Sequence, residues 1–75
     1  MIPYKNISQK SGVKAYAIEP EGIKVEFEND GTYLYTYKSA GKAAIEKMKK
    51  LAQSGKSLST FISQKIKDKF AKKIE

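Results

Sequence analysis

Residues 23–28 and 32–37 form two runs in which apolar and polar side chains alternate. The first run alternates bulky apolar residues with lysine and glutamate, and the second carries a tyrosine at every other position. Strict alternation is typical of a β-strand with one buried face. The Asn29-Asp30-Gly31 segment between the runs is rich in turn-forming residues, so the pattern predicts a β-hairpin.

Two registers of this hairpin are open, and they place the tyrosines on opposite faces. A two-residue turn at Asp30-Gly31 pairs Glu26 with Tyr35 and mixes the tyrosines with charged side chains. A three-residue loop, with Gly31 left-handed in a bulge, pairs Val25 with Tyr35 and gathers the bulky side chains on one face. We favour the three-residue loop because it satisfies the binary pattern of both strands, and the tyrosines would then be mainly core.

A further strand is expected upstream of the hairpin. Residues 1–10 are expected to be extended, with a short edge segment at residues 4–7, and residues 13–18 form a strand candidate. Periodicity does not decide which of its two faces is buried. One face carries Val13, Ala15 and Ala17, and the other carries Lys14, Tyr16 and Ile18. The segment Glu19-Pro20-Glu21-Gly22 fits a type I turn into the next strand. Residues 11–38 are therefore expected to form a three-stranded antiparallel meander.

The remaining residues, 39–75, carry helical patterns. Ser39 is a suitable N-cap for a helix over residues 40–53, and Gly55 is a natural residue just past its end. The apolar residues of this helix share one sector of a helical wheel. They are Ala40, Ala44, Ile45, Met48, Leu51 and Ala52.

A second helix is expected to begin after Ser57 or Ser59 and to continue toward Lys73. Its apolar residues are Leu58, Phe61, Ile62, Ile66, Phe70 and Ile74. Because several of them lie four residues apart, the apolar stripe drifts by about 40° at each step of an α-helix. We therefore expect burial up to Ile66, with Phe70 and Ile74 at the periphery. The predicted fold class is α+β, a three-stranded antiparallel β-meander followed by two C-terminal helices packed on one face.

The length and composition indicate one small domain over residues 1–75 and argue against an enzyme. Cysteine and histidine are both absent, which removes disulfides, thiolate metal sites and the usual general base. Glu26 and Glu28 share a face, but nothing nearby would separate their pKa values into an acid and a base. We therefore predict no catalytic residues, no metal and no cofactor. The sequence also lacks a membrane-spanning run and a signal peptide, so we expect a cytoplasmic protein with no membrane partner.

The charge is distributed very unevenly along the chain. Residues 1–37 have a net charge of −1 and residues 38–75 a net charge of +8, within a total of +7. Such asymmetry can mark a surface for nucleic acid or for an anionic membrane, although a solvated lysine face that keeps the domain in solution explains it as well. All fifteen basic residues are lysine. Without arginine, sequence-specific groove recognition is disfavoured, while non-specific attraction to phosphates stays open.

Two local patterns are candidates for ligand binding. If the tyrosines are exposed, Tyr35 and Tyr37 could stack unpaired bases beside nearby lysines, whereas buried tyrosines would be core residues. Gly55-Lys56-Ser57 looks like the end of a P-loop, but Lys50 stands where that motif needs its first glycine. The free N–H groups at the start of the second helix could still hold one phosphate, or could simply be capped.

Residues 13–66 resemble the KTSC domain, a short module found at the C-terminus of some lysyl-tRNA synthetases and as stand-alone bacterial and phage proteins. The shared features are Ser11-Gly12-Val13, Val25-x-Phe27, Gly31-x-Tyr33, Tyr35-Thr36-Tyr37, and Ser54-Gly55-Lys56 ahead of Ile62. The chain departs from the family at Lys38-Ser39-Ala40, where a Val-Pro is usual, and at Leu58, where an aromatic residue is usual. The association with a tRNA enzyme implies RNA binding, and it points to Tyr35 and Tyr37.

These observations lead to two functional hypotheses. The first is a small, non-enzymatic module that binds RNA or DNA with little sequence preference. Its candidate contact residues are Tyr35, Tyr37, Lys42, Lys49, Lys50 and Lys56. The second is a protein-interaction module or homodimer that uses the edge of the residue 13–18 strand or the uncovered sheet face. Lysine-mediated binding must weaken steeply with salt, whereas apolar association should not.

Overall fold

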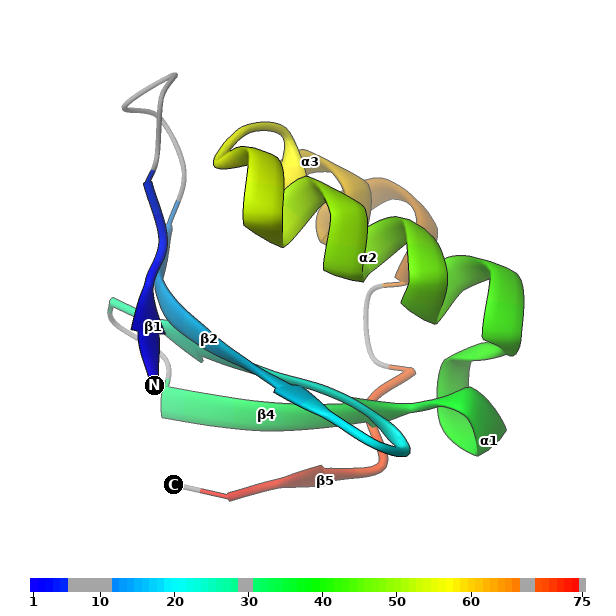
Figure 1. Cartoon of the computed structure of the whole chain (residues 1–75). Helices are drawn as coiled ribbons and strands as arrows, with labels where there is room; N and C mark the ends of the chain where they lie inside the picture. Colours follow the sequence, from blue (N-terminus) through cyan, green and yellow to red (C-terminus); the bar gives the residue numbers. More distant parts are fainter. Residues whose placement is uncertain (6–11, 29–30, 67–68, 75) are drawn as a thin grey trace.

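An antiparallel sheet of five strands carries a layer of helices on one of its faces (Figure 1). This computed structural model describes residues 1–5, 12–28, 31–66 and 69–74. The strands are β1 (Ile2–Pro3), β2 (Val13–Glu19), β3 (Gly22–Phe27), β4 (Gly31–Thr36) and β5 (Lys72–Lys73), in that order across the sheet. The helical layer, residues 37–66, comprises α1 (Tyr37–Ala40), α2 (Lys42–Ser54), α3 (Leu58–Phe61) and the π-helical turn η1 (Ile62–Ile66). The α+β class is confirmed, but three strands and two helices were too few.

The central hairpin has the predicted facing and a different register. Val25 pairs with Tyr33 and Ile23 with Tyr35, while Phe27 pairs with Gly31. Neither expected set of pairs is correct. The observed register differs from the favoured one by two residues, so that Val25 pairs with Tyr33 in place of Tyr35. A shift of two keeps every side chain on its face, because side chains alternate along a strand. Gly31 has the expected left-handed backbone, with φ of 84°. The turn residues Asn29 and Asp30 lie outside the described residues.

A β-bulge in β2 resolves the ambiguity over its buried face. Val13 pairs with Phe27, but Ala15 pairs with Glu26, so the register shifts by one residue between them. The extra residue lets Val13 and Tyr16 both point into the core, where they expose 2% and 6% of their surfaces. Neither of the two strictly alternating faces is therefore the buried one, and a period of two could not reveal this arrangement.

The first predicted helix is divided at Gly41. The side chain of Thr36 accepts a hydrogen bond from the Ser39 N–H, and the Ser39 hydroxyl accepts one from the Thr36 N–H, both at 3.0 Å. This capping box makes Thr36 the N-cap, so the prediction that Ser39 begins the helix is wrong. Gly41 then adopts φ 94° and ψ 148°, which breaks the helical path between α1 and α2. Gly55 ends α2 in the left-handed conformation, as predicted.

The second predicted helix stops far short of Lys73. After Ile66 the chain turns back to the sheet, and β5 pairs antiparallel with β4. The Ala71 N–H donates to the Leu34 carbonyl at 2.6 Å, and the Ile74 N–H donates to the Thr32 carbonyl at 2.7 Å. Ile62 and Ile66, the first and last residues of the π-helical turn, are both buried, as expected. A continued α-helix would have carried the next apolar residues away from the core.

The core lies between the sheet and the helical layer. Its largest fully buried side chains come from both layers: Tyr35, Ile23, Ile45, Met48, Leu58, Ile66, Val13 and Val25. Phe70 packs half-buried against it, and Ile74 is 40% exposed, so the predicted peripheral positions are correct. None of the helices in the described part of the chain is long and apolar enough to cross a membrane.

Candidate functional site

Tyr35, one of the two tyrosines expected to stack bases, is part of the core. It exposes only 2% of its surface and pairs with Ile23 on the sheet face beneath the helices. Its ring also lies 6.3 Å from that of Phe70, measured between centroids. A buried ring presents no face to a base, so we remove Tyr35 from the set of candidate contact residues. The alternative interpretation, in which the tyrosines of β4 are core residues, holds for Tyr35.

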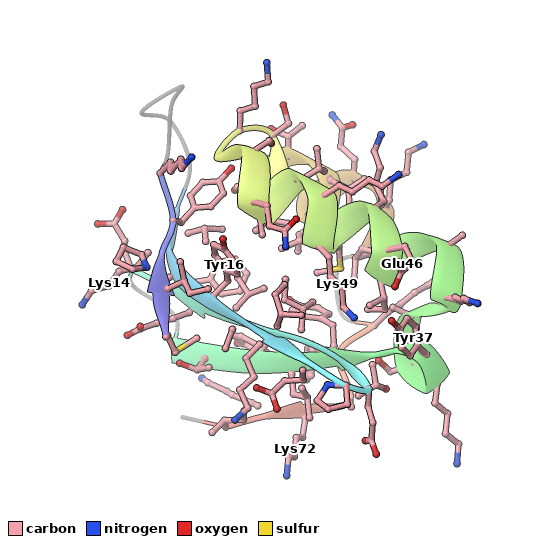
Figure 2. The ribbon with its side chains drawn as sticks, viewed as in Figure 1. Lys14, Tyr16, Tyr37, Glu46, Lys49 and Lys72 are labelled. Atoms are coloured by element: carbon pink, nitrogen blue, oxygen red, sulfur yellow. The ribbon has the colours of Figure 1, made fainter. Side chains whose placement is uncertain are left out.

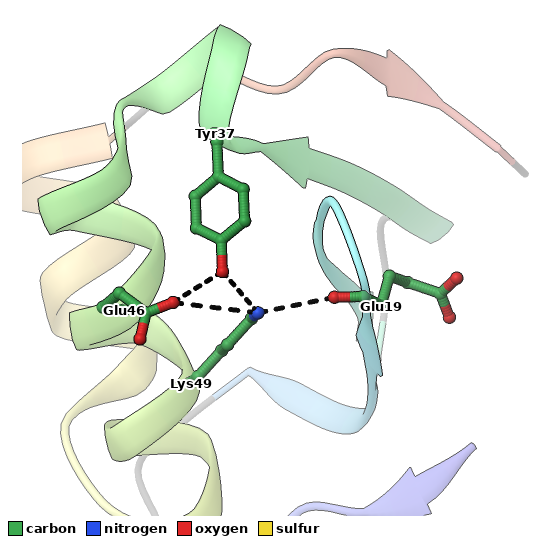
Figure 3. A network of polar contacts seen from close by, with 4 residues as sticks. All are labelled: Glu19, Tyr37, Glu46 and Lys49. Atoms are coloured by element: carbon green, nitrogen blue, oxygen red, sulfur yellow. Dashed lines mark hydrogen bonds and ion pairs between the residues drawn. The ribbon is translucent and has the colours of Figure 1, made fainter.

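Tyr37, the other predicted stacking residue, is held in a polar network that joins the helices to the sheet (Figure 3). Its hydroxyl donates to the carboxylate Oε2 of Glu46 at 2.6 Å and accepts from the ammonium of Lys49 at 2.8 Å. The same ammonium donates to the Glu19 carbonyl oxygen at 3.4 Å and lies 3.8 Å from the Glu46 carboxylate. The network thus connects the end of β2 to α1 and α2.

The network changes the role expected for Lys49. The side chain of Lys49 is only 17% exposed, and its ammonium already has three oxygen partners. A phosphate would have to displace these partners, so the geometry favours a structural role over a phosphate contact. The hydrogen bond from the Tyr37 hydroxyl, followed by the nearby Lys49, Lys42 and Lys50 charges, lowers the pKa of Glu46 below its ordinary value of 4.5. Glu46 is therefore ionised at neutral pH.

The other predicted lysines, Lys42, Lys50 and Lys56, are exposed on the helical layer, together with Lys47 and Lys65. Residues 37–66 contain seven lysines and one acidic residue, Glu46, whereas residues 1–36 contain four lysines and five acidic residues. Figure 2 shows nitrogen-tipped side chains projecting from the outer side of the helices. Because the single carboxylate is engaged in the network, the outer surface of the helical layer is strongly basic.

A groove of about 300 Å³ lies on this basic surface between α2 and the α3–η1 segment. It is lined by Lys47, Leu51, Ser57, Thr60, Phe61, Gln64 and Lys65. Leu51 and Phe61 are partly buried and pack against the core from outside. Sequence patterns assigned both residues to the buried stripe and so missed the groove. The one available signal was that Lys47 and Lys65 flank these apolar positions at helical spacing.

The start of the second predicted helix does not offer a phosphate site. α3 does begin after Ser57, as one of the two predicted starts, but it has only four residues. The Leu58 N–H donates to the Tyr4 hydroxyl at 3.3 Å, and Leu58 is fully buried. Ser57 has a left-handed backbone, with φ of 67°, and its side chain makes no capping hydrogen bond. The Leu58 N–H that could have bound a phosphate therefore donates to the hydroxyl of Tyr4, which is itself buried.

Two other shallow hollows carry carboxylates. One, of about 270 Å³, is lined by Glu19, Pro20, Glu21, Lys24 and Leu34. The second, of about 360 Å³, is lined by Glu21, Thr36, Tyr37 and Lys38. The glutamates make both hollows poorer sites for an anion than the groove on the helical layer. Across the described ranges, no group of three acidic, histidine or cysteine side chains is placed to hold a metal ion.

Comparison with protein-family models, with curated proteins and with solved structures found no match to this chain.

Proposed function

We propose that this protein is a small, non-enzymatic module that binds nucleic acid, RNA in particular, with little preference for sequence. The contact surface in this proposal is the outer side of the helical layer. The exposed lysines that we assign to it are Lys42, Lys47, Lys50, Lys56 and Lys65. The observation that carries the proposal is the segregation of charge: residues 37–66 hold seven lysines and one acid, and that acid is engaged with Tyr37 and Lys49.

The type of basic residue supports a sequence-tolerant contact. Lysine ammonium groups attract phosphates as point charges, and the bidentate recognition of guanine that arginine provides is absent from this chain. The choice of RNA over DNA comes from the resemblance to the KTSC domain and stays part of the proposal. The proposal also retains the cytoplasmic location expected from the sequence.

The proposed contact set differs from the one expected from the sequence. Tyr35 is buried, and the Tyr37 hydroxyl and the Lys49 ammonium are occupied by partners within the protein. Lys42, Lys50 and Lys56 remain in the set because they are exposed. Lys47 and Lys65 join them because they line the groove on the same surface.

The test measures fluorescence anisotropy of a labelled single-stranded RNA over a range of salt concentrations. If all five lysines contact phosphates, the logarithm of the association constant should fall with the logarithm of salt concentration with a slope of about −3.5. A triple variant on the helical layer, Lys42→Gln/Lys50→Gln/Lys56→Gln, should reduce the slope to about −1.4.

A matched control removes three lysines from the opposite side of the molecule, Lys14→Gln/Lys24→Gln/Lys72→Gln. Figure 2 shows Lys14 and Lys72 pointing away from the helices, and Lys24 pairs with Leu34, which in turn pairs with Lys72. Both triple variants lower the net charge equally, so only a localised interface distinguishes them. Equal weakening by both variants, or no binding at low salt, would overturn the proposal.

A second candidate function is association with a protein partner or with another copy through the sheet face turned away from the helices. Leu34 is partly exposed on that face, and Ile74 exposes 40% of its surface nearby. Association through the edge of β2 is less favourable than expected, because β1 already pairs with Ala15 and Tyr16. Sedimentation equilibrium at low and high salt tests this candidate, since an apolar dimer should persist in salt.

A further inference from the structure

The groove on the helical layer has an apolar floor that the fold leaves uncovered. α2 and α3 run in opposite directions along the sheet (Figure 1). The groove is lined by residues of α2 and of the segment from Ser57 through α3 to η1. Leu51 of α2 and Phe61 at the end of α3 form its apolar part, and both pack inward against core residues. A phenyl ring at the surface offers a flat face with the geometry that stacking interactions require.

The rim of the groove is polar and basic. Lys47 lies one turn before Leu51 on α2, and Lys65 lies about one turn after Phe61 on the antiparallel segment, so the two lysines meet at the same end of the groove. Ser57, Thr60 and Gln64 supply hydrogen-bonding groups along its length. No acidic side chain is among the described residues that line it. The groove therefore favours a ligand with a flat ring and an adjacent negative charge.

The π turn η1 is what gives the groove its second wall. It begins directly after Phe61 and places Ile62 and Ile66 in the core, with 6% and 2% of their surfaces exposed. Gln64 and Lys65 are exposed between these two inward residues and line the groove. Single π turns are rare and are frequently found at functional sites. This backbone irregularity thus coincides with the place where aromatic, amide and ammonium groups meet.

We propose that the groove binds one unpaired base of a single-stranded nucleic acid, stacked on Phe61, with Lys47 and Lys65 contacting the flanking phosphates. This inference rests on the proposed function and deepens it, because it specifies a single strand and one base-binding position. A volume of about 300 Å³ lies at the lower end of the range for small-ligand sites, which suits one base. A base inside a duplex is stacked and paired, so it cannot enter the groove without being extruded.

The first experiment compares Phe61→Leu with the wild-type protein, using a 12-nucleotide single strand and a duplex of the same length. Leucine keeps an apolar contact with the core but removes the flat ring. Binding of the single strand should weaken at least about fivefold, and binding of the duplex should change less than about twofold. Phe70→Leu is the matched control, because Phe70 contacts Tyr33 and Tyr35 at the sheet and does not line the groove. Phe61→Tyr keeps an aromatic ring and should bind the single strand as well as the wild type does.

A second readout needs no variant. In a series of single strands that each carry one 2-aminopurine, the fluorescence should change on binding most strongly when this base occupies the groove, because it then leaves its stacked neighbours and stacks on Phe61. If the strand binds and the fluorescence changes at no position of the 2-aminopurine, the base-binding inference is wrong, even if Phe61→Leu fails to fold. Circular dichroism checks the fold of each variant.

The outcomes separate this inference from the proposed function. If Phe61→Leu binds the single strand as well as the wild type does, while the lysine triple variant binds weakly, the groove inference fails and the proposed function stands. If no nucleic acid binds at low salt, both fail. Binding of a polyglutamate peptide with an affinity equal to that of the single strand would also overturn the inference, because it would show a surface that selects charge alone.

Discussion

Replacing Gly22 with alanine should strongly destabilise the fold, because the added Cβ atom would overlap the backbone of β4. Gly22 begins β3 and pairs with Thr36 at the end of β4. A Cβ atom at position 22 would overlap the carbonyl oxygen of Tyr35 and would lie 2.7 Å from the Thr36 Cα. These neighbours are backbone atoms of a paired strand, so no side-chain rotation can relieve the overlap.

The size of the effect follows from the movement required. Overpacking a closely fitted interior costs about 1–3 kcal/mol, and the upper end applies here because the backbone itself must shift. A domain of 75 residues is expected to have a free energy of unfolding of about 4–11 kcal/mol. A loss of about 3 kcal/mol corresponds to a fall in melting temperature of about 12–24 °C for a domain of this size.

The assay is thermal unfolding followed by far-ultraviolet circular dichroism, with two glycine-to-alanine controls. Gly12 has no atom within 4 Å of an added Cβ, so Gly12→Ala should melt within about 2 °C of the wild type. Gly41 also has open space, but its φ of 94° is unfavourable for alanine, so Gly41→Ala should cost about 1–3 kcal/mol. If Gly22→Ala melts like Gly12→Ala, the close approach of β3 and β4 at this position is refuted.

Three further predictions concern the helical layer. Thr36→Ala removes the N-cap hydrogen bond of α1 and should lower the free energy of unfolding by about 1 kcal/mol, measured by urea denaturation. Lys49→Gln should lower the melting temperature and leave RNA binding unchanged, whereas Lys50→Gln should weaken RNA binding and leave the melting temperature unchanged. If Lys49→Gln weakened RNA binding without lowering the melting temperature, the structural role of Lys49 would be contradicted. Tyr37→Phe should raise the pKa of Glu46 toward 4.5, measured by NMR titration. Since that pKa is lowered in the folded protein, the stabilisation by ionised Glu46 is present above pH 4.5 and is lost as the pH falls through the lowered value. The difference in stability between Tyr37→Phe and wild type should therefore shrink at low pH. A difference that is as large well below this range as at neutral pH would contradict this coupling.

The elements that local patterns predicted correctly are those whose signal lies within a few residues. The alternation over residues 23–28 and 32–37 correctly placed Ile23, Val25 and Tyr35 on the inner face of the hairpin. The apolar sector of α2 correctly predicted the burial of Ile45, Met48 and Ala52, and Gly55 correctly marked its end. In these cases backbone geometry and neighbouring side chains specify the conformation before any distant contact forms.

The candidate site was predicted less completely, because exposure depends on partners far away in the chain. Lys49 and Lys50 are adjacent and chemically identical, yet only Lys49 meets a carbonyl 30 residues away, that of Glu19. The sequence alone had no means of distinguishing them. The groove likewise exists only because α3 and η1 pack beside α2 and leave Leu51 and Phe61 partly uncovered.

The sequence by itself determined the α+β class, the facing of the central hairpin, the amphipathic α2 and the basic character of the C-terminal half. Tertiary structure decided the hairpin register, the bulge in β2 and the identity of the exposed lysines. It also decided that the last residues of the expected second helix form the strand β5. The division has one physical cause. Periodicity and capping act over a few residues, whereas register, strand addition and burial are set by the packing of segments that the chain brings together only when it folds.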